Sequence, residues 1–245
     1  MALPEPLVRL RRAVGGDIFA LMVACTTVHV AMLVAINGLH SSTVATVYDR
    51  WLALSWDALL SGRLWTLLTY PLLHDLDGIS HLLFNLLGLY FFAPQFFRTA
   101  GRRGFWRLAA SAAIAGGLLQ LVWHLLVGHS HILVGISAVT MALLTVFALA
   151  NPTAEVYLFF AIRVPARYLV PIVVALDVLG ALSGSDVAVF GHLGGVAVGF
   201  LAAAGWKWQV ARLRLLALLG KLPKRAPFEV IDGGRTKPSS RDKTN

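Results

Sequence analysis

The chain has 245 residues, of which 58% are hydrophobic and 13% are charged, and its formal net charge is +9 at pH 7. Soluble domains carry about 25% charged residues, so this composition excludes an ordinary soluble protein and indicates a membrane protein. The positive charge does not indicate nucleic-acid binding, because the basic residues lie between and beyond the apolar runs. The single cysteine, Cys25, excludes an intramolecular disulfide.

Apolar runs recur along the chain, and most approach the ~20 residues needed to cross a ~30 Å hydrocarbon core. They are Ile18–Ile36, Ile79–Phe97, Leu108–Val127, Ile132–Ala150, Tyr168–Leu182 and Val187–Trp206. The fifth run is short and contains a proline and an aspartate, Pro171 and Asp177. The sequence therefore predicts an all-α, polytopic membrane protein with six transmembrane helices.

Lysine and arginine indicate the orientation of these runs. Of the 21 basic residues, all but Arg50 and Arg63 lie on one side of the predicted bundle, before the first run, in alternate loops or after the sixth. The positive-inside rule therefore places both termini in the cytoplasm, with the protein in the cell membrane. The first run is expected to be a retained anchor, because it is longer than a typical signal-peptide core and no small-residue cleavage site follows it.

Three parts of the chain are expected. Residues 1–16 form a cytoplasmic N-terminus, residues 17–209 form the six-helix membrane domain, and residues 210–245 form a basic cytoplasmic tail, disordered at its end. The long first loop, residues 39–78, contains tryptophans and a tyrosine among leucines. That composition favours short helices lying in the membrane interface with an aromatic belt.

Polar side chains occur near one end of three of the runs. The second run opens with His81 and Asn85, which share a helical face because they are four residues apart. Ser137 lies in the fourth run and His192 in the sixth, and all three runs begin on the outer side. At 1.5 Å per residue the four side chains lie within roughly 3–11 Å of the outer surface. Polar groups inside a membrane are costly, so their shared depth indicates a functional site.

This set contains the groups that a serine needs in order to hydrolyse a peptide bond. His192 could take the proton of the Ser137 hydroxyl and make it a nucleophile. His81, Asn85 and the backbone N–H of Ser137 could donate to the oxyanion of the tetrahedral intermediate. Glycines at 191, 195 and 199 form a small-xxx-small ridge, which is expected to bring His192 within hydrogen-bonding reach of Ser137.

Each of these residues also has a structural explanation when it is considered singly. A serine in a membrane helix usually bonds back to the backbone. His192 could be a packed interhelical donor, the glycine ridge could serve packing alone, and His81 with Asn85 could simply join two helices. Only their combination at one depth favours catalysis.

Other polar residues in the runs are interpreted structurally. Asp177 suggests a Ser-His-Asp triad, but a structural hydrogen bond or a water-lined position is the favoured interpretation. Gln120 is expected to contribute to packing. His124, His129 and His131 suggest a metal site, but no cluster of carboxylates or cysteines accompanies them.

At these residues the sequence resembles the rhomboid family of intramembrane serine proteases, over roughly residues 60–205. His81-Leu-Leu-Phe-Asn85 resembles the family's H-x-x-x-N element, and Gly135-Ile136-Ser137 matches the start of its G-x-S-G motif. His192-Leu-Gly-Gly195, followed by Gly199, resembles the H-x-x-G-x-x-x-G motif of the family's final helix.

The resemblance implies a six-helix core of rhomboid type with a catalytic dyad of Ser137 and His192 and no third acid. It implies that His81 and Asn85 stabilise the oxyanion and that the substrates are membrane-spanning proteins cut near the outer surface. The implied partners are transmembrane substrates and the lipid bilayer, without nucleic acid, metal ion or organic cofactor. The oligomeric state stays open.

The sequence departs from the family pattern at several positions. Ala138 stands where the family usually has a glycine after the serine, and Thr66 follows Trp65 where the first loop usually has Trp-Arg. Ala93–Phe97 replaces a glycine and a glutamate. These departures sustain an alternative function, a catalytically inactive rhomboid-like protein that binds client transmembrane segments. A transporter or channel is a third and weaker hypothesis, because few polar residues continue into the inner half of the runs.

Overall fold

The computed structural model describes residues 4–128, 131–158, 161–184 and 187–218. The chain divides into two units, residues 1–206 and residues 207–245. The first unit contains the fold and the candidate site. In the second, residues 207–218 are helical, and the predicted disorder at the end of the tail lies outside the described residues.

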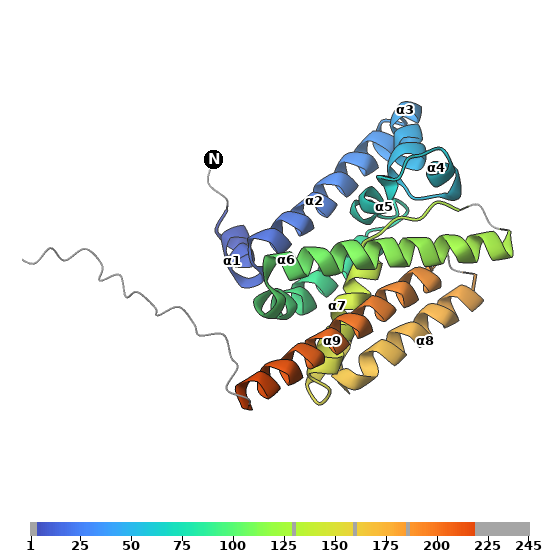
Figure 1. The fold of residues 1–245 in the computed structure, drawn as a ribbon. Helices are drawn as coiled ribbons and strands as arrows, with labels where there is room; N and C mark the ends of the chain where they lie inside the picture. The colour runs from blue at the N-terminus through green and yellow to red at the C-terminus, as the bar shows by residue number, and fades with distance from the viewer. Residues whose placement is uncertain (1–3, 129–130, 159–160, 185–186, 219–245) are drawn as a thin grey trace, which may run out of the picture. The chain divides into compact units, whose positions relative to one another are not determined.

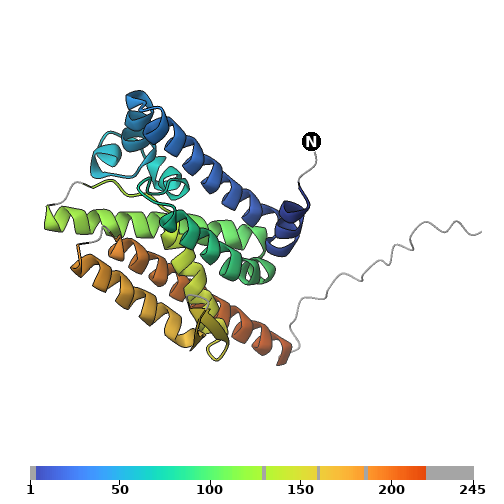
Figure 2. The ribbon, with the colours of Figure 1, turned by 180° about the vertical axis from the view of Figure 1, so that it is seen from behind.

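The described chain is mostly helical (Figures 1 and 2). Its N-terminal part contains α1 (Glu5–Val14), α2 (Gly16–Leu33) and the π-helical turn η1 (Val34–Gly38). The first loop contains α3 (Ser42–Thr46), η2 (Val47–Leu52), α4 (Trp56–Leu60), α5 (Thr66–Thr69) and η3 (Tyr70–Leu72). The rest contains α6 (Ser80–Val127), α7 (Ser137–Ala150), β1 (Glu155–Leu158), β2 (Ile162–Pro165), η4 (Ala166–Tyr168), α8 (Leu169–Leu182) and α9 (Val189–Leu218). The short helices expected in the first loop are present.

The long helix α6 is two helices joined at a sharp break. Gly101 has φ 70° and ψ 178°, which is not helical, and only glycine adopts a positive φ of this kind at low cost. The rings of Phe97 and Phe105 pack across the break with their centroids 5.6 Å apart. The two halves correspond to the second and third predicted runs.

Two expectations about secondary structure need correction. The fourth run was expected to be helical from Ile132, but α7 begins at Ser137, because the preceding segment pairs with the first loop through Leu54 and Leu133. The all-α prediction also missed one antiparallel hairpin, β1–β2, in which Glu155 opposes Pro165. β-branched and aromatic residues favour extended backbone in this short stretch.

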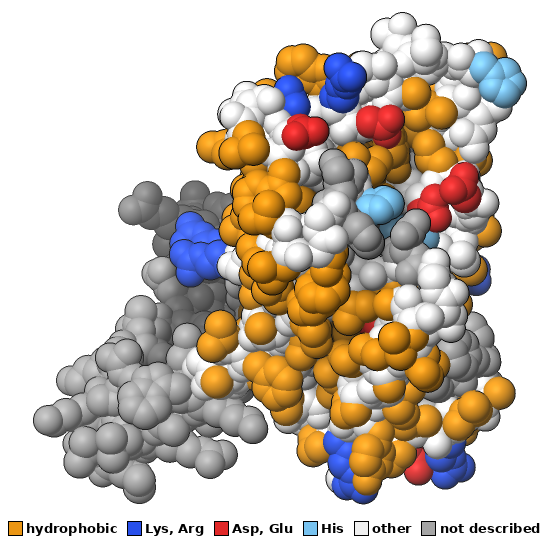
Figure 3. Space-filling model, turned by 90° about the vertical axis from the view of Figure 1, so that its right-hand side faces the viewer, with side chains coloured by type: hydrophobic (Ala, Val, Ile, Leu, Met, Phe, Trp, Pro, Cys, Tyr) orange, Lys and Arg blue, Asp and Glu red, His pale blue; other side chains and the backbone are white. Residues whose placement is uncertain are grey.

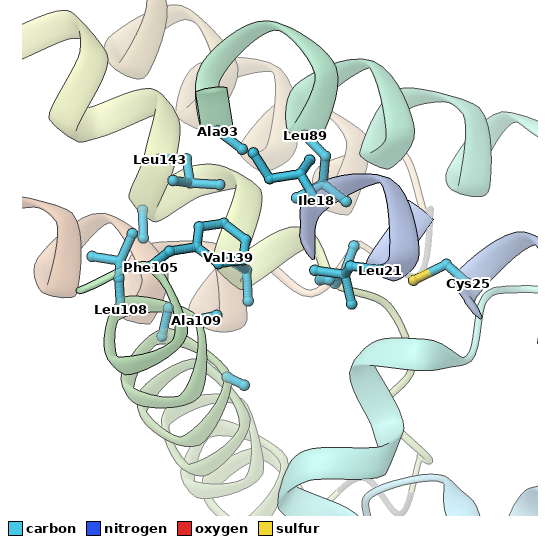
Figure 4. Packing of buried hydrophobic residues seen from close by; sticks show 14 of the residues in the cluster. Ile18, Leu21, Cys25, Leu89, Ala93, Phe105, Leu108, Ala109, Val139 and Leu143 are labelled. Carbon is cyan, nitrogen blue, oxygen red and sulfur yellow. The ribbon is translucent and has the colours of Figure 1, made fainter. Parts of the chain in front are cut away.

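The hydrophobic core joins α2, both halves of α6, and α7. Figure 4 shows its side chains meeting from these helices: Ile18, Leu21 and Cys25 from α2, Leu89, Ala93, Phe105, Leu108 and Ala109 from α6, and Val139 and Leu143 from α7. Contacts among residues far apart in the sequence therefore fix the position of α7, which carries Ser137 at its beginning.

Large apolar side chains also cover the outside of the first unit. Leu125, Leu126, Leu182 and Leu201 are 66–80% exposed, and on the face in Figure 3 hydrophobic side chains fill the middle while charged side chains gather towards the ends. Among the described residues, the stretches Gly16–Gly38 and Ser80–Val127 are long and apolar enough to cross a membrane, and α7 and Val189–Gly205 are shorter apolar helices. An apolar exterior of this kind suits contact with lipid.

Candidate active site

The four predicted site residues lie at the beginnings of three helices. His81 and Asn85 lie in the first two turns of α6, Ser137 is the first residue of α7, and His192 lies in the first turn of α9. The first N–H groups of a helix have no partner inside the helix, and together with the helix dipole they favour negative charge nearby. A serine in this position stands beside donors suited to an oxyanion.

The turn that precedes Ser137 depends on a glycine. Gly135 has φ +110°, and its N–H donates to the carbonyl oxygen of Tyr70 at 3.0 Å. A Cβ at this position would lie 2.6 Å from Nε2 of His81. Glycine is therefore required both by the backbone conformation and by the imidazole. Because Gly135 has no side chain, the His81 ring lies against the backbone two residues before Ser137.

Asn85 connects α6 to α7 through its side chain, which is almost fully buried. Its Nδ2 donates to the His81 carbonyl oxygen at 3.0 Å, and its Oδ1 accepts from the Thr140 hydroxyl at 3.2 Å. The same hydroxyl lies 2.9 Å from the Ser137 carbonyl oxygen. Thr140 was missed by the sequence reasoning, although its place one turn after Ser137 on the same helical face could have indicated it.

The glycine ridge brings α9 against α7, as its spacing predicts. A Cβ at Gly195 would collide with the Ala138 carbonyl oxygen, and one at Gly199 would lie 2.6 Å from the Ala142 carbonyl oxygen. A step of four residues along α9 thus matches a step of four along α7, so the two helices run in the same direction where they touch.

This parallel packing places His192, one turn before Gly195, within about one helical turn of the level of Ser137. No hydrogen bond joins the Ser137 hydroxyl to the His192 ring in the described structure. The catalytic roles of these two residues stay a prediction.

The imidazole of His192 is instead bonded to α8. Its Nδ1 lies 2.6 Å from Oδ2 of Asp177, and the two side chains are only 15% and 13% exposed. The structural hydrogen bond expected for Asp177 is therefore present, and its partner is the proposed catalytic base. The sequence suggested this pairing only through the less favoured Ser-His-Asp interpretation, because the two residues belong to different helices whose packing the sequence does not specify.

Gln120 links α6 to the beginning of α9. Its Oε1 accepts from the Gly191 N–H at 3.0 Å, and its Nε2 lies 2.9 Å from Nε2 of His124. The rings of His124 and His131 lie 6.0 Å apart, and His129 lies outside the described residues. Within the described ranges, no group of three or more histidine, cysteine, aspartate or glutamate side chains has an arrangement that could hold a metal ion.

Two departures from the family pattern have local explanations. The methyl group of Ala138 faces α6, where a Cβ at Gly116 would lie 2.6 Å from it, so a glycine opposite makes room for this methyl. Thr66 is fully buried, and its hydroxyl donates to the Arg63 carbonyl oxygen at 2.7 Å. A long arginine side chain would not fit at that buried position without rearrangement.

A further histidine, His74, lies beside the site in the loop between η3 and α6. It is fully buried, and its ring centroid is 6.4 Å from that of His29 and 5.2 Å from that of His81. Burial, with the neighbouring His81, lowers the pKa of His74 to about 3. The ring is therefore neutral at physiological pH. The sequence reasoning did not single it out.

Fold and site together define a membrane-embedded helical protein with a serine, two histidines and an asparagine at the beginnings of adjacent helices. The family model described as the Rhomboid domain matches residues 61–208, more than half of the chain. The protein belongs to the rhomboid family. Members of this family are embedded in membranes, in agreement with the hydropathy of the chain.

A curated relative supports the same assignment. RHOMBOID-like protein 12, mitochondrial, from Arabidopsis thaliana is 31% identical to this chain over 176 residues. The match covers 66% of this chain and 50% of that protein. The chain thus spans about half the length of the curated relative it matches.

Proposed function

We propose that this protein is an intramembrane serine endopeptidase that cleaves membrane-spanning substrates near the outer surface. The observation that carries the proposal is the convergence of three helix beginnings on Ser137. On one side the His81 ring lies against Gly135. On the other, Gly195 packs against Ala138 and brings the turn that carries His192 to the same level.

The proposed reaction uses these groups in two steps. The oxygen of Ser137 attacks the substrate carbonyl carbon while Nε2 of His192 takes the hydroxyl proton and later gives it to the leaving amine. The oxyanion is stabilised by the backbone N–H of Ser137, the His81 ring and the amide of Asn85. Water then hydrolyses the acyl-enzyme, with His192 acting as base, and Ser137 regains its proton.

The proposal includes six membrane-crossing helices: α2, the two halves of α6, α7, α8 and α9. It is supported by the exposed leucines on α2, α6, α8 and α9 and by the distribution of lysine and arginine, which favours cytoplasmic termini in the cell membrane. Reporter fusions after Arg103 should be cytoplasmic and fusions near Asp57 should be external. A cytoplasmic signal near Asp57 would contradict this topology.

The second candidate function is a catalytically inactive rhomboid-like protein that binds client transmembrane segments. Two observations favour it: Ser137 and His192 are not hydrogen-bonded to each other, and the Asn85 amide bonds to the His81 backbone. Catalytic hydrogen bonds are often long before substrate binds, so this geometry does not exclude the protease.

Cleavage of a single-span model substrate in liposomes distinguishes the two functions. The wild type should cleave, Ser137→Ala should lose nearly all activity, and a fluorophosphonate probe should label the wild type on Ser137 alone. The matched control is Ser111→Ala, which removes an exposed hydroxyl from α6. Substrate binding without cleavage by folded wild-type protein would favour the inactive alternative, and undiminished cleavage by Ser137→Ala would reject Ser137 as the nucleophile.

A further inference from the structure

Among the described residues, the polar partner of the Asp177 carboxylate is His192. Asp177 is the single acidic residue of α8, it is 13% exposed, and it lies 2.6 Å from Nδ1 of His192. An ionised carboxylate inside a membrane helix is costly unless a partner compensates for it. A short contact between nitrogen and a carboxylate oxygen, as found here, is typical of a strong hydrogen bond.

The contact determines what the two ring nitrogens of His192 can do. With the Asp177 carboxylate as the acceptor, Nδ1 carries the proton, and the lone pair of the neutral ring is then on Nε2. This is the tautomer that a general base acting through Nε2 requires. The hydrogen bond to Asp177 also restricts rotation of the His192 ring.

The packing of α9 against α7 makes the orientation of the His192 ring relevant to Ser137. α9 is fixed against α7 by Gly195 and Gly199. α8 is less firmly held, because Leu169, at its start, is its only buried residue among those described. Asp177 accepts the hydrogen bond of the His192 imidazole from α8, whereas Ser137 belongs to α7.

We infer that Asp177 is a positioning residue for His192, so that the site works as a Ser-His-Asp set rather than as the dyad that the family resemblance implies. The inference rests on the proposed protease function. As the Ser137 hydroxyl loses its proton to Nε2, the Nδ1 proton stays on the ring. The Asp177 carboxylate accepts the Nδ1–H hydrogen bond and stabilises the imidazolium that forms.

Kinetics with Asp177→Asn test this role. The amide keeps the size of the side chain but lacks the charge and can stabilise the wrong tautomer, so kcat should fall by roughly 10²–10⁴ with little change in KM. Asp177→Glu should recover part of the rate. Asp49→Asn, which neutralises an exposed aspartate of the first loop, should leave kcat unchanged. Wild-type kcat in folded Asp177→Asn would overturn the inference.

A measurement without turnover keeps this inference distinct from the proposed function. In Ser137→Ala protein, ¹⁵N NMR of the histidine side chains should find neutral His192 protonated on Nδ1, and this tautomer should lose its preference in Asp177→Asn. If the wild type failed to cleave while His192 was protonated on Nδ1 as expected, the protease function would be rejected and the positioning of His192 by Asp177 would stand. Protonation of His192 on Nε2 in the Asp177-containing protein would reject the positioning role, whatever the activity.

Discussion

The hydroxyl of Thr140 lies 3.2 Å from the side-chain oxygen of Asn85, across the contact between α7 and α6, and 2.9 Å from the Ser137 carbonyl oxygen, so its one proton is shared between these two acceptors. The contact with Asn85 holds the amide of a proposed oxyanion donor one turn away from Ser137. A valine has nearly the shape of threonine but cannot donate a hydrogen bond, so Thr140→Val removes the hydrogen bond to Asn85 without leaving a cavity.

Thr140→Val should therefore lower cleavage through the orientation of Asn85. A neutral hydrogen bond contributes about 1 kcal/mol, which corresponds to a roughly fivefold loss of rate. The control is Thr145→Val, because the Thr145 hydroxyl bonds only within α7, to the Met141 carbonyl oxygen at 2.7 Å. Equal effects of the two substitutions on initial cleavage rates would show that the bond to Asn85 has no separate role.

The oxyanion donors themselves predict a graded loss. Removing one such donor costs ~10²–10³ in rate, whereas loss of the nucleophile is close to total. Asn85→Ala should thus retain weak activity, with His81→Ala in the same range or lower, in single-turnover cleavage assays. Complete loss in folded Asn85→Ala would indicate that its bonds to His81 and Thr140 serve structure instead.

Gly195→Ala should disrupt the packing of α9 on α7, because the new methyl group collides with the Ala138 carbonyl oxygen. Overpacking of this kind typically costs about 1–3 kcal/mol, and displacement of His192 should abolish most cleavage. Gly205→Ala on the same helix meets no atom within 4 Å and should be neutral or slightly stabilising, since alanine is the better helix former. Thermal unfolding in detergent and cleavage assays would measure both effects, and a stable, active Gly195→Ala would contradict the proposed packing.

Ala138→Gly tests whether the departure beside the serine limits catalysis. The methyl group faces Gly116 on α6, so its removal should change turnover little. The stability should fall by up to about 1 kcal/mol, as for an alanine-to-glycine change in other helices. A large gain in cleavage of the model substrate would show that the methyl group obstructs the reacting centre.

Acidification should destabilise the fold through His74. Its pKa is lowered to about 3 in the folded protein, against 6.5 as the ordinary value. The contribution of the neutral, buried ring is therefore complete above pH 6.5 and is lost as the pH falls towards 3. The loss approaches about 1.4 kcal/mol for each pH unit in this window.

His74→Phe removes the titrating group and should flatten the dependence of the unfolding temperature on pH between 7 and 4. The matched control is His40→Gln, which removes an exposed histidine. An unaltered pH dependence in His74→Phe would assign the acid sensitivity to other groups.

The sequence predicted those features that depend on hydropathy and on short spacings. The apolar runs correspond to α2, to the two halves of α6 and to most of α7, α8 and α9. The four-residue spacing of Gly195 and Gly199 predicted a close helix contact, and the structure supplies its partners, Ala138 and Ala142. Local patterns suffice here because each describes a single helix face.

Features that join distant segments could not be predicted. Ile132–Ile136 is apolar enough for a helix, yet Leu133 pairs with Leu54, and hydropathy cannot distinguish lipid contact from burial against another loop. The bond between Asp177 and His192 likewise depends on how two helices are rotated about their axes. Neither the composition nor the spacing of the residues specifies that rotation.

The contacts of Gly195 and Gly199 also limit how α9 can slide. A displacement of one to three residues would set side chains against the carbonyl oxygens that now face these glycines. Only a shift by a whole four-residue turn, about 6 Å, would restore comparable contacts, and that shift would carry His192 away from the level of Ser137. These contacts therefore oppose small shifts of α9 along its axis, and they leave rotation of the imidazole and separation of the helices as the movements by which the candidate site could change.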